Sequence, residues 1–307
     1  MARHASELQS LLVDGSFDGE VYPNEPLARH TTYRIGGPAR FFVQVDSIGA
    51  LGSLLEVCER SGAAWYVVGK GSNLLVADEG FSGVVITLGR DFRMFNYDED
   101  ARIVSAGGGC SLSALIREMF RRSLGGLEFA AGTPGTVGGA LRMNAGSRQE
   151  WIGSRVRSVT TVRPCEGLRR YGADQLLWDY RRSSIPADEV VVECELSVKP
   201  VDPFCIRGKM EASLSRRSKT QPLSLPSCGS VFRNPDGASA AQLIESCGLK
   251  GCRVGGAEVS SVHANFIVNA DGATAYDVIR LIKQIQTKVH EVHGIDLQPE
   301  VRFLGFA

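Results

Sequence analysis

One glycine-rich stretch constrains this 307-residue chain more than any other feature of its sequence. Between positions 126 and 139 the chain carries five glycines, one proline and two threonines, and further glycine follows at 146. A hairpin turn needs far fewer such residues. Backbone without side chains can lie against a large flat or phosphorylated ligand, or against another closely packed backbone segment. The stretch therefore predicts either a ligand-binding loop or a crossing of backbones.

A second glycine loop follows a short apolar run that ends at position 68. Gly69 and Gly71 leave successive N–H groups free to turn toward an anion, and Ser72 and Asn73 add donors. This pattern suits a pyrophosphate, although a plain tight turn would look the same. Leu74 stands where the dinucleotide fingerprint needs its last glycine, and no segment has the spacing of a P-loop.

Composition excludes several classes of protein. The 34 Lys and Arg residues balance the 34 Asp and Glu residues, so charge gives no reason to expect nucleic acid or an anionic membrane as partner. No apolar run reaches 18 residues, which argues against a membrane span, and no charged-then-apolar leader opens the chain. The eight cysteines form no CxxC pair, and His290 and His293 lack a third ligand, so we expect no metal site and a reducing, cytoplasmic setting.

Hydrophobic periodicity predicts alternating strands and helices after position 33, in an α+β arrangement. Residues 1–23 lack a periodic pattern and are interpreted as an extension. The last third is predicted to be a unit of its own, beginning near Phe204. Predicted strands cover 41–45, 65–68, 84–86, 102–105, 156–163, 189–198 and 297–304, and predicted helices cover 48–58, 112–120, 207–219, 238–247 and 274–293.

Several separate motifs together carry a resemblance to a known family. They are NEPL at 24–27, HTTYRIGGPA at 30–39, the two glycine loops, YRRS at 180–183, PSCGSVFRNP at 226–235, GLKG at 248–251, VGGA at 254–257, HANFIVN at 263–269 and LQPEV at 297–301. In this order and spacing the chain resembles the UDP-N-acetylenolpyruvoylglucosamine reductase (MurB) family over roughly residues 20–305.

The resemblance implies a flavoprotein with the FAD-binding fold of the vanillyl-alcohol oxidase type. It places two α+β subdomains at 24–90 and 91–203, after the extension, and an α+β domain for the UDP-sugar substrate at 204–307. Covalent flavin in this fold uses a His or Cys near the ring, and neither glycine loop has one, so we expect non-covalent FAD. The implied FAD contacts are Gly69, Gly71, Ser72, Asn73, Leu74, Thr133, Pro134, Gly135, Thr136, Gly138 and Gly139.

The reaction that the resemblance implies reduces an enolpyruvyl ether of UDP-N-acetylglucosamine to UDP-N-acetylmuramate, a peptidoglycan precursor, with NADPH as hydride donor. Ser230 would give the proton to C2 of the substrate, Arg181 would hold its carboxylate, and Glu300 would assist polarisation and protonation. Taken alone, these residues could equally be a loop hydroxyl, a surface arginine and one half of a salt bridge. The implied substrate contacts are Tyr180, Asn144, Asn234 and Lys219.

Some positions depart from the family pattern. Arg142 stands where many members have an aromatic residue, and the stretch from Ser183 to Val190 is too short for the tyrosine-bearing insertion of one branch. We therefore expect this chain to belong to the branch without that insertion. From the resemblance as a whole we expect the UDP-sugar and NADPH as partners, and no obligate protein partner. Two alternatives remain open: another FAD oxidoreductase on the same scaffold, and a nucleotide-sugar binding protein that has lost its flavin.

Overall fold

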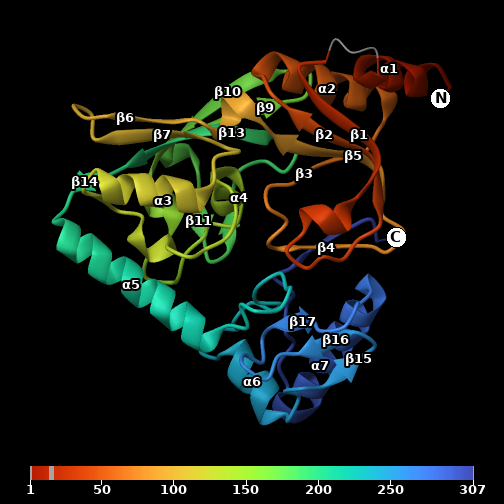
Figure 1. Ribbon diagram of the computed structural model, residues 1–307, viewed down its shortest axis with the longest axis vertical. Helices are drawn as coiled ribbons and strands as arrows, with labels where there is room; N and C mark the ends of the chain where they lie inside the picture. Colours follow the sequence, from red (N-terminus) through yellow and green to blue (C-terminus); the bar gives the residue numbers. More distant parts are fainter. Residues whose placement is uncertain (1, 14–16, 307) are drawn as a thin grey trace. The chain divides into compact units, whose positions relative to one another are not determined.

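The computed structural model describes residues 2–13 and 17–306, and its chain divides into two compact units (Figure 1). Unit 1 contains the described residues up to Pro23, then Arg40–Gly69 and Gly83–Ser215. Unit 2 contains Asn24–Ala39, Lys70–Ser82 and the chain from Arg216 onward. The predicted division into three domains, with an extension at 1–23, stays a prediction.

The first sheet of unit 1 has the strand order β1-β2-β5-β3. Its strands are β1 (Gly19–Pro26), β2 (Pro38–Val45), β3 (Trp65–Val67) and β5 (Phe81–Leu88), so the predicted strands at 41–45, 65–68 and 84–86 are confirmed. Helix α2 (Ile48–Ser61) begins where the Ser47 hydroxyl accepts the Ala50 N–H at 3.3 Å, and it ends at Gly62, with φ of 64°. Helix α1 (Ala2–Val13) packs on α2 and buries Leu8 and Leu12, an element that the sequence did not predict.

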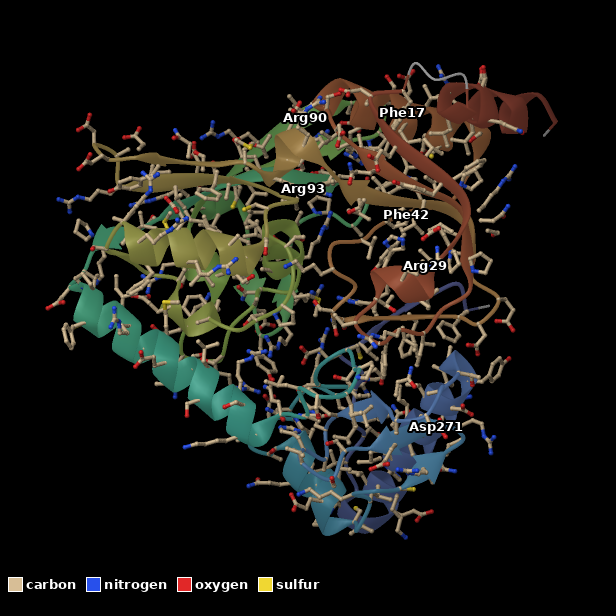
Figure 2. All side chains as sticks on the ribbon, viewed as in Figure 1. Phe17, Arg29, Phe42, Arg90, Arg93 and Asp271 are labelled. Atoms are coloured by element: carbon tan, nitrogen blue, oxygen red, sulfur yellow. The ribbon has the colours of Figure 1, made fainter. Side chains whose placement is uncertain are left out.

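A short 3-10 segment, η2 (Arg90–Arg93), ties two parts of unit 1 together (Figure 2). Arg90 forms an ion pair with Asp18 at 3.2 Å, and Arg93 donates to the side chain of Gln44 at 2.9 Å. These contacts join the loop after β5 to the beginning of β1 and to β2. Both pairs are exposed, so their contribution to stability is small.

The second sheet of unit 1 has the order β10-β9-β13-β7-β6, and all its pairings are antiparallel. Helices α3 (Leu112–Arg121) and α4 (Val137–Arg142) share a hydrophobic core with this sheet. The strands are β6 (Phe95–Asp98), β7 (Ile103–Gly107), β9 (Val156–Arg163), β10 (Gly167–Gly172) and β13 (Val190–Ser197). Smaller elements are β8 (Leu124–Gly125), η3 (Glu128–Ala130), η4 (Ile152–Arg155), η5 (Ala173–Gln175), β11 (Trp178–Asp179), β12 (Arg182–Ser183) and β14 (Lys199–Pro200).

Helix α5 (Pro203–Thr220) contains the boundary between the two units and begins four residues earlier than predicted. Proline is tolerated in the first turn because its missing N–H has no helical acceptor there. Pro203 therefore starts the helix.

Unit 2 is built on a three-stranded antiparallel sheet and two helices. These are β15 (Arg253–Val254), β16 (Ala257–Val259), β17 (Ile267–Asn269), α6 (Ala240–Ser246) and α7 (Ala275–His293), with η1 (Leu27–His30) from its N-terminal segment. The predicted helix at 274–293 is confirmed: Thr274 and Asp277 form a capping box, and Val278, Ile282, Ile285 and Val289 are buried.

The predicted strand at 297–304 is shorter in the structure. Only β18 (Arg302–Leu304) is a regular strand, and it pairs in parallel with β4 (Leu74–Val76). Upstream, Pro299 makes an isolated bridge with Phe232. Because proline has no N–H to donate, it interrupts a regular ladder, and the periodicity could not reveal this.

Candidate active site

The structure brings Ser230 and Glu300 onto adjacent segments of unit 2. The Glu300 N–H donates to the Val231 carbonyl at 2.7 Å, and the Arg233 N–H donates to the Gln298 carbonyl at 2.9 Å. Residues 230–233 therefore run antiparallel to residues 298–301. Ser230, the predicted proton donor, is therefore one residue out of register with Glu300, although 70 positions separate the two residues in the sequence.

Cys228 lies close to the same place, two residues before Ser230. Burial raises the pKa of its thiol to about 12, and the nearby Glu300 carboxylate acts in the same direction. The hydroxyl of the fully buried Tyr33 is a neighbour of this thiol, and burial raises the pKa of Tyr33 well above its usual value. Cys228 is thus a buried, neutral thiol, whereas Ser230 and Glu300 are partly exposed.

One glycine loop contacts this pair of segments through Asn73. Its side-chain amide donates to the Glu300 carbonyl at 3.1 Å, and its own carbonyl accepts the Arg302 N–H at 3.0 Å. Ser72 lies near Gly229: a Cβ built on that glycine would be 4.0 Å from the Ser72 carbonyl oxygen. Leu74 is buried and opens β4.

Gly71 has a structural reason to be glycine. Its φ is 57°, and a Cβ there would lie 2.3 Å from the carbonyl oxygen of His30. The requirement therefore comes from close packing against the segment around Thr31 and from the left-handed backbone. A substitution at Gly71 would disturb the fold of unit 2, so it cannot serve as a clean probe of a pyrophosphate contact.

The two glycine loops meet within unit 1. A Cβ on Gly69 would lie 2.6 Å from Oγ1 of Thr136, and the same hydroxyl accepts the Gly139 N–H at 3.3 Å at the start of α4. The N–H groups of Val137 and Gly138 donate to the carbonyls of Cys110 and Gly108, each at 2.9 Å. Part of the long glycine stretch is therefore a crossing of packed backbones, as the alternative interpretation of its sequence stated.

Other residues of the two glycine loops leave backbone uncovered. Gly69, Gly132, Pro134 and Gly139 are exposed, and a Cβ on Gly139 would meet only Thr136 Oγ1, at 3.5 Å. The hydroxyl-bearing Thr133 and the positive-φ Gly135 lie between them, both partly exposed. Bare backbone with neighbouring hydroxyls is the donor set that a diphosphate group requires, so these residues fit FAD.

Arg181 lies at the tip of a two-residue turn in unit 1. Strands β11 and β12 pair Trp178 with Ser183, and Tyr180 and Arg181 connect them. Arg181 has a φ of 57°, a backbone conformation that costs a non-glycine residue on the order of 1 kcal/mol. Its guanidinium lies 5.7 Å from the Tyr180 ring centroid, and that of Arg148 lies 4.7 Å away.

The side chain of Asn144 is hydrogen-bonded to the backbone of this hairpin. It is 4% exposed, its amide donates to the Asp179 carbonyl at 2.8 Å, and its oxygen accepts the Gly153 N–H at 3.0 Å. In this structure the side chain is thus engaged with the backbone beside Tyr180. Its predicted contact with substrate stays a prediction.

Arg142 holds the short segment after the hairpin. Its guanidinium donates to the carbonyls of Ile185 at 3.0 Å and Pro186 at 2.6 Å, and to that of Glu189. Burial lowers the pKa of Arg142. Glu189 is 1% exposed and accepts hydrogen bonds from Thr161 and Tyr171 at 2.5 and 2.7 Å. Arg142 therefore fixes the backbone of the segment from Ile185 to Glu189.

The remaining predicted substrate residues lie in unit 2. Asn234 accepts the Ala240 N–H at 3.0 Å, at the start of α6, and Lys219 is exposed near the end of α5. The sequence assigned no role to Asn265, although it stands in the HANF motif. It is buried and hydrogen-bonded to Phe232, two residues after Ser230.

Among residues 2–13 and 17–306, no three His, Cys, Asp or Glu side chains are arranged to hold a metal ion. The helices within those same ranges are all too short or too polar to cross a membrane.

Comparisons with known protein families identify two regions of the chain. A model of FAD-binding domains matches residues 39–168, which defines the class as a protein with an FAD-binding domain. A model of the C-terminal domain of UDP-N-acetylenolpyruvoylglucosamine reductase matches residues 221–304.

Full-length relatives cover nearly the whole chain. The reductase of Heliobacterium modesticaldum is 45% identical over 94% of this chain and 92% of its own length, and that of Bacillus subtilis is 39% identical over 289 residues. The crystal structure of MurB from Thermus caldophilus has a TM-score of 0.80 at 34% identity, over 93% of this chain and 98% of that one. The chain belongs to the UDP-N-acetylenolpyruvoylglucosamine reductase (MurB) family. The family and the mixed α and β fold with an FAD-binding domain, both predicted from the sequence, are confirmed.

Proposed function

We propose that this protein reduces UDP-N-acetylglucosamine enolpyruvate to UDP-N-acetylmuramate, using FAD and NADPH, in the synthesis of peptidoglycan precursors. Relatives named for this reductase share up to 45% identity over more than nine-tenths of the chain. The observation that carries the proposal at the level of residues is the 2.7 Å hydrogen bond from Glu300 to Val231. It sets the predicted acid beside the segment that carries the predicted proton donor.

The cofactor supplies hydride transfer from NADPH to C3 of the enolpyruvyl group, chemistry that protein side chains lack. The backbone of Gly69, Gly132, Gly135 and Gly139, with the hydroxyls of Thr133 and Thr136, would hold its diphosphate in unit 1. In unit 2, the predicted contacts Ser72 and Asn73 adjoin the Ser230 and Glu300 segments. Gly71 and Gly138 would act by allowing close backbone packing.

The chain's own residues would handle the carboxylate and the proton. Hydride addition at C3 leaves negative charge at C2 and on the adjoining carboxylate. Arg181 would hold that carboxylate and stabilise the charge, because a guanidinium pairs with it through two parallel hydrogen bonds. The Ser230 hydroxyl would deliver the proton to C2, and Glu300 would polarise and assist that transfer. Tyr180, Asn144, Asn234 and Lys219 are proposed substrate contacts.

The alternative of a different oxidoreductase on the same scaffold is less well supported. Such an enzyme would share the FAD-binding domain but has no reason to match the reductase C-terminal domain over 221–304. A cytoplasmic location is part of the proposal, and the free thiols of all eight cysteines support it.

A two-step titration of the purified protein tests the proposed function. The protein should carry flavin absorption bands, NADPH should bleach them under anaerobic conditions, and the enolpyruvyl sugar nucleotide should restore them. Bleaching without restoration would favour the alternative oxidoreductase, and a colourless protein that binds no added FAD would favour a binding protein.

A further inference from the structure

The backbone of the Ser230 segment, residues 230–233, bonds on one side to residues 298–300. Val231 and Arg233 bond to residues 298–300, so the N–H and carbonyl groups of Phe232 between them point away from that neighbour. Phe232 is 1% exposed. Without a partner on the outer side, two buried backbone groups next to the predicted proton donor would be unsatisfied.

The side chain of Asn265 supplies that partner. The Phe232 N–H donates to its Oδ1 at 2.9 Å, and its Nδ2 donates to the Phe232 carbonyl at 2.8 Å. The backbone carbonyl of Asn265 accepts the Val231 N–H at 2.8 Å. One residue thus binds three backbone groups of two consecutive residues, Val231 and Phe232. A side-chain amide offers one donor and one acceptor side by side, and unlike a carboxyl group it keeps both at every pH.

Asn265 is itself held firmly. It is 4% exposed, and its N–H donates to Nδ1 of His263 at 3.2 Å. A turn closes around it, because the Phe266 N–H bonds to the His263 carbonyl at 2.9 Å and the chain then enters β17. A buried and anchored amide can transmit its own position to the segment that it binds.

We propose that Asn265 is a positioning residue for sugar reduction: it fixes the backbone after Ser230, and with it the direction in which the Ser230 hydroxyl points. This inference rests on the proposed function. Proton transfer needs the donor within about 0.5 Å of its productive position, and a misplacement of 1 Å can cost on the order of 10²-fold in rate. Flavin reduction by NADPH requires no proton at C2 and should be insensitive to Asn265.

The substitution Asn265→Asp tests this at nearly constant shape. A carboxylate keeps the acceptor for the Phe232 N–H but replaces the donor with a negative oxygen facing the Phe232 carbonyl. A protonated carboxyl group can restore the donor. Relative to the wild type, the sugar half-reaction should fall about 10²-fold at alkaline pH and recover toward acid pH, with the NADPH half-reaction within about threefold throughout.

Two further variants separate this effect from general damage. Asn265→Ala lacks both groups, so its sugar half-reaction should stay slow at every pH. This variant retains His263 and Glu300, so any pH dependence that comes from those two residues is present in it as well. Asn269→Asp is the matched control. Asn269 is in the same unit, and its side chain makes two comparable bonds, to the Tyr33 carbonyl at 3.1 Å and from the Ala273 N–H at 2.8 Å, neither of them to residues 230–233.

Stopped-flow absorbance of the flavin-loaded proteins measures both half-reactions. A selective, pH-reversible loss in Asn265→Asp with none in Asn269→Asp supports the inference. Equal losses in both half-reactions, or a sugar half-reaction within threefold of wild type, overturn it. If Asn265→Asp does not fold, Asn265→Gln takes its place: it keeps the amide one methylene further out, and a wild-type sugar rate in that variant also overturns the inference.

If the proposed function is wrong, the measurements will differ from those that overturn only the role of Asn265. In that case the wild type itself would not reoxidise with the sugar nucleotide. Should the wild type react and Ser230→Ala react equally fast, only the role of Ser230 fails. A normal Asn265→Asp beside a slow Ser230→Ala rejects the positioning role alone.

Discussion

The side-chain amide of Asn73 donates to the backbone carbonyl of Glu300 at 3.1 Å, across 227 positions of sequence. This bond ties a loop predicted to contact the flavin to the segment that carries a predicted catalytic acid. The parallel pairing of β4 with β18 continues the connection immediately downstream of both residues. Within unit 2, the predicted cofactor loop and the predicted catalytic segment therefore form one hydrogen-bonded structure.

Removing the Ser230 hydroxyl should separate the two half-reactions. Ser230→Ala should leave flavin reduction by NADPH nearly unchanged, because that step delivers no proton to C2. Sugar reduction should slow by about 10²–10⁴-fold, the usual contribution of a placed general acid, or roughly 3–5 kcal/mol of activation free energy. Stopped-flow absorbance on each half-reaction measures this. A sugar half-reaction within a few-fold of wild type would exclude Ser230 as the proton donor.

Much of the fold could be predicted because burial imposes periods on the sequence. The strand at 156–163 has the predicted bounds, and α7 differs from its prediction by one residue. Helix α1 was missed, since the sequence before position 24 has no sustained period. The last strand was overextended, because the local bonding of Pro299 depends on Phe232, 67 positions away.

The sequence predicted the residues of the candidate site but not the contacts that they make. The resemblance named Ser230, Glu300 and the glycine loops, yet it could not say why each glycine is needed. Gly71 is required by the His30 carbonyl, whereas Gly139 is open. Asn265 carried no signal of its own, because its function depends on two backbone groups of Phe232 that the fold leaves facing it.

A branched side chain at Gly139 should weaken flavin retention without unfolding the protein. Gly139 is exposed in α4, and a Cβ there has only an ordinary contact with Thr136. Gly139→Val should therefore unfold at a urea concentration close to that of wild type, but with less bound FAD in the purified protein. Gly208→Val is the matched control, because Gly208 is also an open helical glycine, in α5. Full flavin content in Gly139→Val would place the diphosphate elsewhere.

Loss of the Arg142 guanidinium should destabilise unit 1. Arg142→Met keeps the length of the side chain but leaves the carbonyls of Ile185, Pro186 and Glu189 without this donor. Removing a buried charged donor of this kind costs about 3 kcal/mol. Urea unfolding followed by circular dichroism should show the loss. Arg60→Met, at an exposed pair with Glu56 on α2, should cost less than about 0.5 kcal/mol. Equal midpoints for the two variants would contradict the anchoring role.

Stability should fall in mild acid because of His263. Burial lowers the pKa of its imidazole, nearby Lys250 acts in the same direction, and its Nδ1 accepts the Asn265 N–H at 3.2 Å, which protonation would prevent. The unfolded chain, with a pKa near 6.5, then binds the proton more readily than the folded chain. The stabilisation is fully present above about pH 6.5 and is lost as the pH falls toward the folded value. His263→Asn offers an acceptor that does not titrate, so between about pH 7.5 and 5.5 its urea midpoint should fall less than that of wild type. Parallel curves for the two proteins would assign the acid sensitivity to another group.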